Sequence, residues 1–127
     1  MSTADLTILH VDDDADMRHV TALCLSGDAG VTVVSAESGR EALGLLQSGL
    51  RPDVIVLDVS MPEMDGPATL SALRDLDGLK SAPVVFLTGR AAEQERRRYL
   101  ALGAASVIPK PFDPSTLADD LRAIARG

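Results

Sequence analysis

The 127-residue chain has no tryptophan, a single cysteine and only 2% aromatic residues. Cys24 has no second thiol to pair with, which fits a reducing compartment. With so few rings, a stacking platform for single-stranded nucleic acid is not expected. The sequence also lacks a run of about 18 apolar residues, the length that a membrane-spanning helix needs. No charged and apolar leader precedes the first expected strand, so the sequence predicts a cytoplasmic protein.

Positive charge is also in short supply, and the formal net charge is −7. Nucleic acid and anionic membranes would repel such a chain, so neither is an expected partner. The length and the hydrophobic content of 46% suit one compact domain with its own core. We therefore expect a single domain over residues 1–127.

Segments typical of strands and helices alternate along the chain. The expected strands are 6–11, 31–35, 54–57, 84–87 and 107–110. The expected helices cover 16–25, 38–49, a segment opened by Asp65, 91–102, and a segment from Asp113 to the C-terminus. Near-continuous Val, Ile and Leu runs predict a parallel sheet with both faces covered, that is, a doubly wound α/β fold with five strands. Because Pro109 lacks an N–H, the last strand is expected at an edge of the sheet.

Four of these strands end in polar groups. Asp12 and Asp13 follow the first, Asp58 follows the third, Thr88 ends the fourth, and Lys110 ends the fifth. In open α/β sheets, groups at the carboxyl ends of neighbouring strands share one edge, where such folds place their sites. The sequence therefore predicts a site that holds a divalent metal and a phosphoryl group.

The acidic residues differ in what they are expected to do. Adjacent carboxylates such as Asp12 and Asp13 repel one another unless a cation or water lies among them, and Mg²⁺ prefers oxygen ligands. Asp58 can act as a nucleophile toward phosphorus. A solvated loop or helix N-cap is the better interpretation for Asp14 and Asp16.

The remaining strand-end groups suit phosphate. The Thr88 hydroxyl can donate to a phosphoryl oxygen and Gly89 leaves space beside it, although a strand-end threonine alone is more often structural. Lys110, one of only two lysines, offers a compact charge for a phosphate oxygen. Asp65 is the better cap for the third helix, which leaves Asp58 without a structural role.

These motifs strongly resemble the receiver domain of bacterial response regulators. The resemblance rests on Val11-Asp12-Asp13, Asp58 with Met61-Pro62, Met64-Asp65-Gly66, Thr88-Gly89 and Lys110-Pro111-Phe112. Each motif is weak alone, but their order and spacing over almost the whole chain are specific. The resemblance implies a flavodoxin-like strand order 2-1-3-4-5 and a cis bond between Lys110 and Pro111.

The resemblance also implies roles for the acidic residues. Asp58 would take a phosphoryl group from the phosphohistidine of a histidine kinase or a histidine phosphotransfer protein. Asp13, Asp58 and the backbone carbonyl of Ser60 would hold Mg²⁺, with Mn²⁺ as an alternative ion. Asp12 would support the metal through water.

Further positions follow from the same resemblance. Thr88, Gly89 and Lys110 would bind the phosphoryl oxygens, and Ser60 and Arg90 would tune the lifetime of the acyl phosphate. The chain would be a signalling phosphoacceptor that catalyses only its own phosphorylation and dephosphorylation. It is expected to be a stand-alone receiver, whose output is contact with a target protein through the fourth helix, the last strand and the fifth helix.

One position departs from the family pattern. Receivers often carry Tyr or Phe three residues before the lysine, where this chain has Val107, and Tyr99 on the preceding helix is not an obvious substitute. Val107 keeps a phosphorylation-independent binding module as an alternative. A second alternative is a small phosphohydrolase with Asp12 as its nucleophile. A flavodoxin-like cofactor carrier is disfavoured because no Gly- or Ser/Thr-rich phosphate loop follows the first strand.

Two other groups have ordinary interpretations. His10 is expected to be a hydrogen-bonded core residue. The Arg96-Arg97-Arg98 run is expected to form a solvated helix face, with a partner surface as the alternative.

Overall fold

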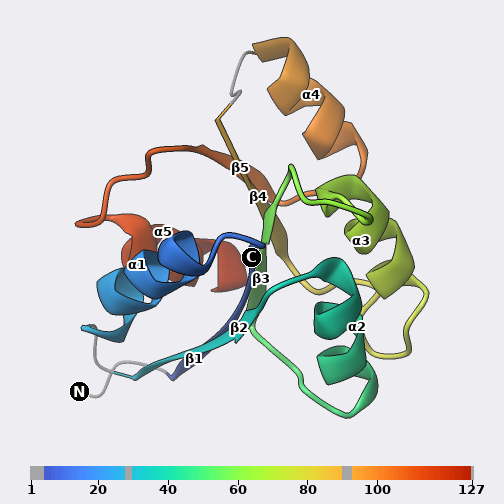
Figure 1. The fold of residues 1–127 in the computed structure, drawn as a ribbon, viewed down its shortest axis with the longest axis horizontal. Helices are drawn as coiled ribbons and strands as arrows, with labels where there is room; N and C mark the ends of the chain where they lie inside the picture. The colour runs from blue at the N-terminus through green and yellow to red at the C-terminus, as the bar shows by residue number, and fades with distance from the viewer. Residues whose placement is uncertain (1–4, 28–29, 90–92, 127) are drawn as a thin grey trace.

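The computed structural model describes residues 5–27, 30–89 and 93–126. Strands and helices alternate throughout these ranges (Figure 1). The strands are β1 (Leu6–Val11), β2 (Val31–Ala36), β3 (Val54–Asp58), β4 (Val84–Thr88) and β5 (Ser106–Pro109). The helices are α1 (Ala15–Ser26), α2 (Gly39–Gln47), α3 (Gly66–Arg74), α4 (Glu93–Ala101) and α5 (Leu117–Arg126). Within the described ranges, each helix is too short or too polar to cross a bilayer.

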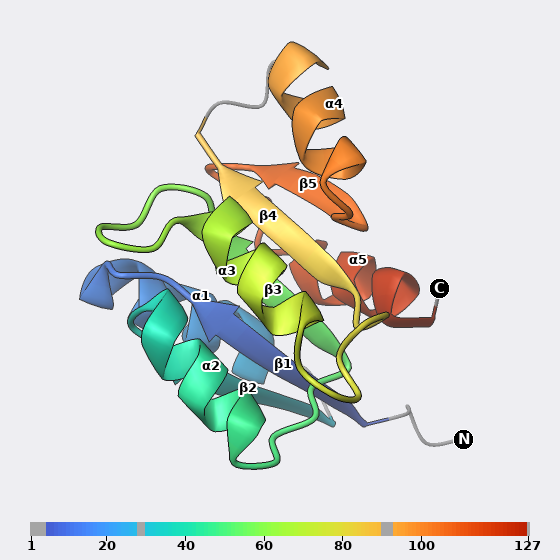
Figure 2. The same ribbon diagram turned by 90° about the vertical axis from the view of Figure 1, so that its right-hand side faces the viewer.

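The five strands form one parallel sheet in the order β2-β1-β3-β4-β5. Helices α1 and α5 lie on one face of this sheet, and α2 and α3 lie on the other (Figures 1 and 2). Helix α4 lies beside the β4–β5 end of the sheet (Figure 1). The predicted doubly wound fold and its strand order are confirmed.

Two hydrophobic cores flank the sheet because successive side chains of a strand point to opposite faces. Leu9 and Val11 of β1 contribute to the core under α2 and α3, while Leu6 and Ile8 contribute to the core under α1 and α5. All residues of β3 and β4 are buried. This explains why their sequences are continuous apolar runs that end in a single polar residue.

Aspartates begin two of the helices. The Asp14 side chain accepts hydrogen bonds from the backbone N–H groups of Asp16 and Met17 at the start of α1. The Asp65 side chain accepts from the N–H of Ala68 at 2.8 Å at the start of α3. Each bond satisfies a donor that has no partner inside the helix. The expected capping roles of Asp14 and Asp65 are confirmed.

The start of the fifth helix was predicted wrongly. We expected the helical segment to start at Asp113, but α5 begins at Leu117. The Asp113 carboxylate instead accepts from the backbone N–H and the hydroxyl of Ser115, at 2.9 and 2.7 Å. These two local bonds close a turn, so the regular helix begins after it.

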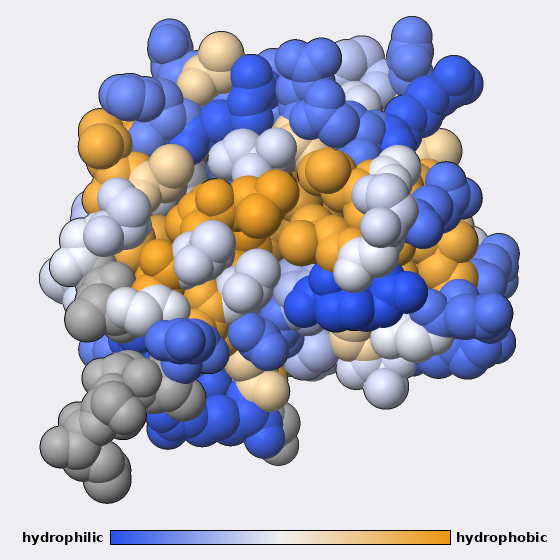
Figure 3. Space-filling model, turned by 90° about the horizontal axis from the view of Figure 1, so that it is seen from below, coloured by the Kyte–Doolittle hydropathy of each residue, from blue (hydrophilic) through white to orange (hydrophobic). Residues whose placement is uncertain are grey.

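The two edge strands have different surroundings: a side chain of α4 contacts β5, whereas hydrophobic side chains are exposed on the side of β2. β5 lies at one edge, as Pro109 predicts, and the Arg96 side chain of α4 donates to the Val107 carbonyl at 3.3 Å. β2 forms the opposite edge. Figure 3, seen from below Figure 1, shows a band of hydrophobic side chains on this side of the molecule. On the neighbouring α1, Val20 and Leu23 are exposed.

A glycine allows α2 to approach α3 closely. A Cβ atom at Gly39 would collide with the Thr69 hydroxyl and would lie 2.8 Å from the Met64 sulfur. Thr69 is fully buried and cannot easily give way. By contrast, a Cβ atom at Gly44 of the same helix would meet no atom within 4 Å.

His10 is a core residue, but it is not hydrogen-bonded as predicted. It is fully buried, and within the described part of the chain neither ring nitrogen has a hydrogen-bond partner. Burial is the largest of the influences that lower the pKa of His10 to about 4, and the charge of Lys110 acts in the same direction. The Nε2 atom lies 3.9 Å from an Asp12 carboxylate oxygen. His10 is therefore neutral in the folded protein near pH 7.

The two glycines of α2 should respond oppositely to alanine. Gly39→Ala should destabilise the fold by about 1–3 kcal/mol because the added methyl overpacks the α2–α3 contact. Gly44→Ala should stabilise it by about 0.5–1 kcal/mol because the site is open and alanine favours the helix. Urea denaturation of both variants checks this, and equal shifts of the two midpoints would contradict the packing argument.

Stability should depend on pH through His10. As the pH falls below 6.5 the unfolded imidazole binds a proton, while the folded one stays neutral until about pH 4. The contribution of His10 is therefore fully present above pH 6.5 and is lost toward pH 4. Between pH 6.5 and pH 5 the loss is about 2 kcal/mol.

This loss can be isolated by comparing the wild type with His10→Leu in denaturation at pH 7 and pH 5. The stability of the variant should fall less on acidification than that of the wild type. The exposed His19 supplies the control, since His19→Gln should keep the wild-type pH dependence. Parallel curves for His10→Leu and the wild type would refute the assignment.

Candidate functional site

The polar strand ends meet at the carboxyl edge of the sheet, as predicted. Asp12 and Asp13 follow β1, Asp58 and Thr88 end β3 and β4, and Lys110 follows β5. β3 lies between β1 and β4, which places Asp58 at the centre of this group.

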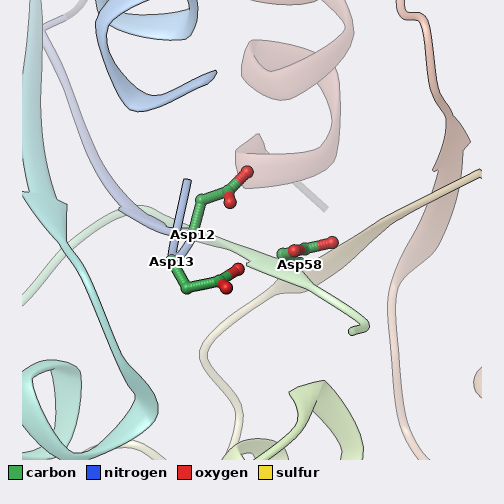
Figure 4. Close-up of side chains that lie close together, drawn as sticks. All are labelled: Asp12, Asp13 and Asp58. Carbon is green, nitrogen blue, oxygen red and sulfur yellow. The ribbon is translucent and has the colours of Figure 1, made fainter. Parts of the chain in front are cut away.

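Three carboxylates form a compact cluster. Asp12, Asp13 and Asp58 each offer an oxygen atom, and these atoms all lie within 4.8 Å of one another (Figure 4). Asp12 and Asp58 are buried, whereas Asp13 is exposed. The cluster is thus open to solvent on the side of Asp13.

Asp12 is fixed by its own loop. One carboxylate oxygen accepts the Asp14 N–H at 2.9 Å, and the Arg18 side chain donates to the Asp12 backbone carbonyl at 2.7 Å. The other oxygen, Oδ2, is buried and has no hydrogen-bond partner among the described residues. A buried carboxylate oxygen without a hydrogen bond lacks part of the compensation for its lost hydration.

Lys110 neutralises part of the acidic charge. Its ammonium donates to Asp58 Oδ1 at 2.9 Å and lies 3.7 Å from Asp12 Oδ2. Its backbone N–H donates to the Thr88 carbonyl at 2.8 Å, which ties the lysine to the end of β4. The Lys110–Pro111 bond is cis, as expected.

Burial and mutual proximity shift the pKa values of Asp58 and Lys110. Burial raises the pKa of Asp58, and the Asp12 carboxylate also raises it, while the hydrogen bond from Lys110 opposes both. For Lys110, burial is the largest single influence and lowers its pKa. The hydrogen bond to Asp58 and the charges of Asp58 and Asp12 outweigh it, so the pKa of Lys110 lies above its ordinary value. Lys110 is therefore a cation near pH 7.

The backbone around Asp58 is packed tightly. A Cβ atom at Gly66, the first residue of α3, would lie 2.8 Å from the Asp58 carbonyl oxygen and 3.1 Å from the Phe86 ring. The Gly66 N–H donates to the Val59 carbonyl at 3.0 Å. The start of α3 is thus pressed against the end of β3, which leaves the Asp58 backbone little freedom.

This cluster fits a hard divalent cation. Its three carboxylates face one ammonium, and the unpartnered Asp12 Oδ2 is a buried oxygen that a cation or a water molecule bound to it would satisfy. Mg²⁺ takes oxygen ligands and keeps several waters, which suits a cluster with an open side.

A polar cavity of about 560 Å³ lies beside the cluster. Val59, Ser60, Thr88 and Gly89 form one wall, and three residues of α4 form the other: Glu95, Arg98 and Tyr99. The helix residues were not predicted. Their i, i+3, i+4 spacing marks one helix face, but the polar sequence of α4 gave no reason to choose that face.

One of the predicted positions stands apart from the cluster. Val107 is a buried β5 residue paired in register with Phe86, and it belongs to a hydrophobic core. Arg90 lies outside the described residues. All three residues of the Arg96-Arg97-Arg98 run are exposed, as expected for a solvated segment. Their contacts differ: Arg96 donates to the Val107 carbonyl, Arg97 pairs with Glu93, and Arg98 lines the cavity.

Comparisons with known proteins agree with this geometry. The chain is 40% identical over 114 residues to an uncharacterised 14.6 kDa protein of Leptolyngbya boryana, covering 90% of this chain and 86% of that one. It is also 40% identical over 119 residues to the transcriptional regulatory protein CpxR of Escherichia coli K12. That match covers 94% of this chain but only 49% of CpxR.

Among solved structures, the chemotaxis protein CheY4 of Vibrio cholerae superposes with a TM-score of 0.86 at 36% identity, covering 95% of this chain and 99% of that one. The sequence profile of the response regulator receiver domain matches residues 8–122. With the strand order 2-1-3-4-5 and the acidic cluster at its carboxyl edge, the chain belongs to the receiver domain family of two-component signalling.

Proposed function

We propose that Asp58 is the phosphoacceptor of this receiver domain. The observation that carries the proposal is the position of its carboxylate, at the end of the central strand, 2.9 Å from the Lys110 ammonium and beside Asp12 and Asp13. The capping of α3 by Asp65 leaves the Asp58 side chain free of a structural task.

The proposed reaction is a direct phosphoryl transfer. A carboxylate oxygen of Asp58 forms a bond to phosphorus while the N–P bond of a phosphohistidine breaks. The electron pair of that bond stays on the imidazole nitrogen of the donor protein, which takes up a proton from water. Such transfer depends on positioning and charge neutralisation, and the fixed strand end and Lys110 supply both.

Mg²⁺ is the proposed cofactor, with Mn²⁺ as an alternative ion. Asp13, Asp58 and the backbone carbonyl of Ser60 would hold it, and Asp12 would support it through a water molecule. When bound, the ion supplies positive charge for the transferring oxygens. The fit rests on the compact carboxylates and the unpartnered oxygen of Asp12.

The phosphoryl oxygens would be bound by the Thr88 hydroxyl, by Lys110 and by the backbone at Gly89. Thr88 and Gly89 line the cavity beside Asp58, and Lys110 already contacts the carboxylate. Ser60 lines the same cavity, so its side chain, together with Arg90, is proposed to govern the access of water to the acyl phosphate. In this proposal the domain turns over no external substrate and catalyses only its own phosphorylation and dephosphorylation.

The proposed partners are a histidine kinase or a histidine phosphotransfer protein as donor, and a target protein on the face of α4, β5 and α5. A groove of about 620 Å³ between β5 and α5 supports the second choice. Its lining includes the apolar Ile108 and Phe112 and the acidic Asp113 and Asp120. This lining suits a protein segment with apolar and basic side chains. We propose a cytoplasmic location, and no nucleic acid or membrane partner for this acidic chain.

The acceptor can be tested by intact mass after incubation with phosphoramidate and Mg²⁺. The wild type should gain one phosphoryl adduct that requires Mg²⁺, because transfer needs the charge on the oxygens neutralised. Asp58→Asn should lose the adduct, since the amide is no nucleophile toward phosphorus.

Asp14→Asn is the matched control. It changes a nearby aspartate that only caps α1, so its adduct should match that of the wild type. An adduct that persists in Asp58→Asn would point to another acceptor, with Asp12 the first suspect, as in an aspartate-nucleophile phosphohydrolase. A wild type without any adduct would favour the phosphorylation-independent module that Val107 keeps open.

Metal binding can be tested separately from transfer. Asp13→Asn should weaken Mg²⁺ binding at least about ten-fold, because it removes a charged ligand. Asp16→Asn, an exposed residue in the first turn of α1, should leave the affinity unchanged. Amide shifts in an NMR titration measure both affinities, and Mn²⁺ should broaden the resonances around Asp13, Asp58 and Ser60. Broadening centred elsewhere would reject the proposed ligands.

A further inference from the structure

β2 leaves one edge of the sheet without a neighbouring strand. Its residues Val31–Ala36 pair in register with β1 on one side, and within the described ranges no strand pairs with the other side. Thr32 and Ser35 are exposed, so solvent reaches the strand. Figure 3 shows that hydrophobic side chains gather on this side of the molecule. The outer edge of β2 is therefore open to a further strand.

Two hydrogen bonds at the ends of β2 show which backbone groups point outward. The Gly30 carbonyl accepts from the Leu6 N–H at 2.8 Å, and the Ala36 carbonyl accepts from the Asp12 N–H at 3.1 Å. Backbone groups alternate in direction along a strand, so every second residue between Gly30 and Ala36 also faces β1. The described part of the chain supplies no backbone partner for the outward N–H and carbonyl groups of the remaining residues, which are Val31, Val33 and Ser35.

This edge lacks the features that usually prevent association between strands. Natural edge strands carry lysine, proline, bulges or inward-pointing charges. The segment Val31–Ala36 has neither a charged residue nor a proline, and its pairing with β1 is continuous. At the opposite edge, β5 ends in Pro109, and Arg96 donates to the Val107 carbonyl. β2 is thus the less protected edge, and its valines and threonine favour strand pairing.

We propose that β2 is a self-association surface, to which a second copy of this chain adds its own β2 in antiparallel orientation. The outward residues define the register. A two-fold axis through Val33 places this residue opposite its own copy and places Val31 opposite Ser35 of the other copy. Residues paired in this way exchange two backbone hydrogen bonds, so the three pairs join the two sheets into one.

A second copy suits this edge because the surface is complementary to itself. A two-fold interface uses the same patch on both partners, and an antiparallel strand edge meets that condition without any other change. The carboxyl ends of the two sheets then point in opposite directions, so both acidic sites remain accessible. The association goes beyond the proposed function and does not require phosphorylation of Asp58.

The oligomeric state of the wild type is measured by sedimentation velocity over a series of concentrations. The molecule should pass from monomer toward dimer between about 10 µM and 1 mM, the range of weak interfaces. Each copy carries a net charge of −7, so the copies repel one another. Association should therefore be stronger at high salt than at low salt, because salt screens this repulsion.

Amide hydrogen exchange, followed by NMR at low and high protein concentration, tests the register. The amides of Val31, Val33 and Ser35 should gain protection as the dimer forms. The amides of Thr32 and Val34 face β1 and should change little. This alternation is specific to pairing through the outer edge of β2, and an interface formed by helices would not produce it.

Two proline variants remove outward donors without touching the bonds to β1. Val33→Pro eliminates the two central hydrogen bonds and should weaken association at least about ten-fold. Ser35→Pro removes donors at both ends of the pairing, and because its side chain is exposed it serves as the test if Val33→Pro does not fold. Arg96→Ala changes the opposite edge and should associate as the wild type does.

Three results would overturn the proposal. The first is a wild type that stays monomeric at the highest concentration in both salts. The second is a dimer in which the protected amides lie outside β2. The third is a dimer that forms equally well in the folded proline variants, because the contact then does not use these donors. None of these results bears on Asp58 as the phosphoacceptor.

Discussion

The charge balance at the carboxyl edge of the sheet is the constraint on which the rest of the structure depends. Asp12 and Asp58 are buried beside one another, and Lys110 offers them a single ammonium. Buried like charges are costly unless paired, so the site is stable only if the loops hold Lys110 in place and leave an opening for a cation. The Lys110–Thr88 backbone bond and the exposed side of Asp13 meet these two requirements.

The site requires a rigid central strand, β3. Because helices cover both faces of β3, no residue of that strand needs to be polar except the one at its end. Gly66 lets α3 press against that end, and Asp65 satisfies the helix start. The Asp58 backbone is thus fixed by strand pairing and packing, and its side chain stays available for chemistry.

Much of this could be predicted from sequence because the relevant signals are local. Apolar runs that end in Asp58 or Thr88 identify buried strands and their carboxyl ends, and a parallel sheet brings those ends together. The start of α5 was missed because the bonds between Asp113 and Ser115 compete with helix formation. His10 was misjudged for another reason: the absence of a partner for a buried side chain depends on three-dimensional packing that no periodicity encodes.

The cavity beside α4 was not predicted because the sequence of this helix is unusual. α4 is almost entirely polar, and Tyr99 alone is buried, so its sequence has no hydrophobic stripe to mark the face that packs. The absence of a stripe is itself informative. A helix held by a wide apolar stripe resists displacement, because many contacts must break together. A helix whose one buried side chain lies at the wall of a cavity is less constrained, and such elements are the ones that local changes can shift. Val107 and Tyr99 therefore belong to one arrangement. The edge strand β5 has a small side chain at position 107, and the large ring in this part of the core comes from Tyr99 on α4.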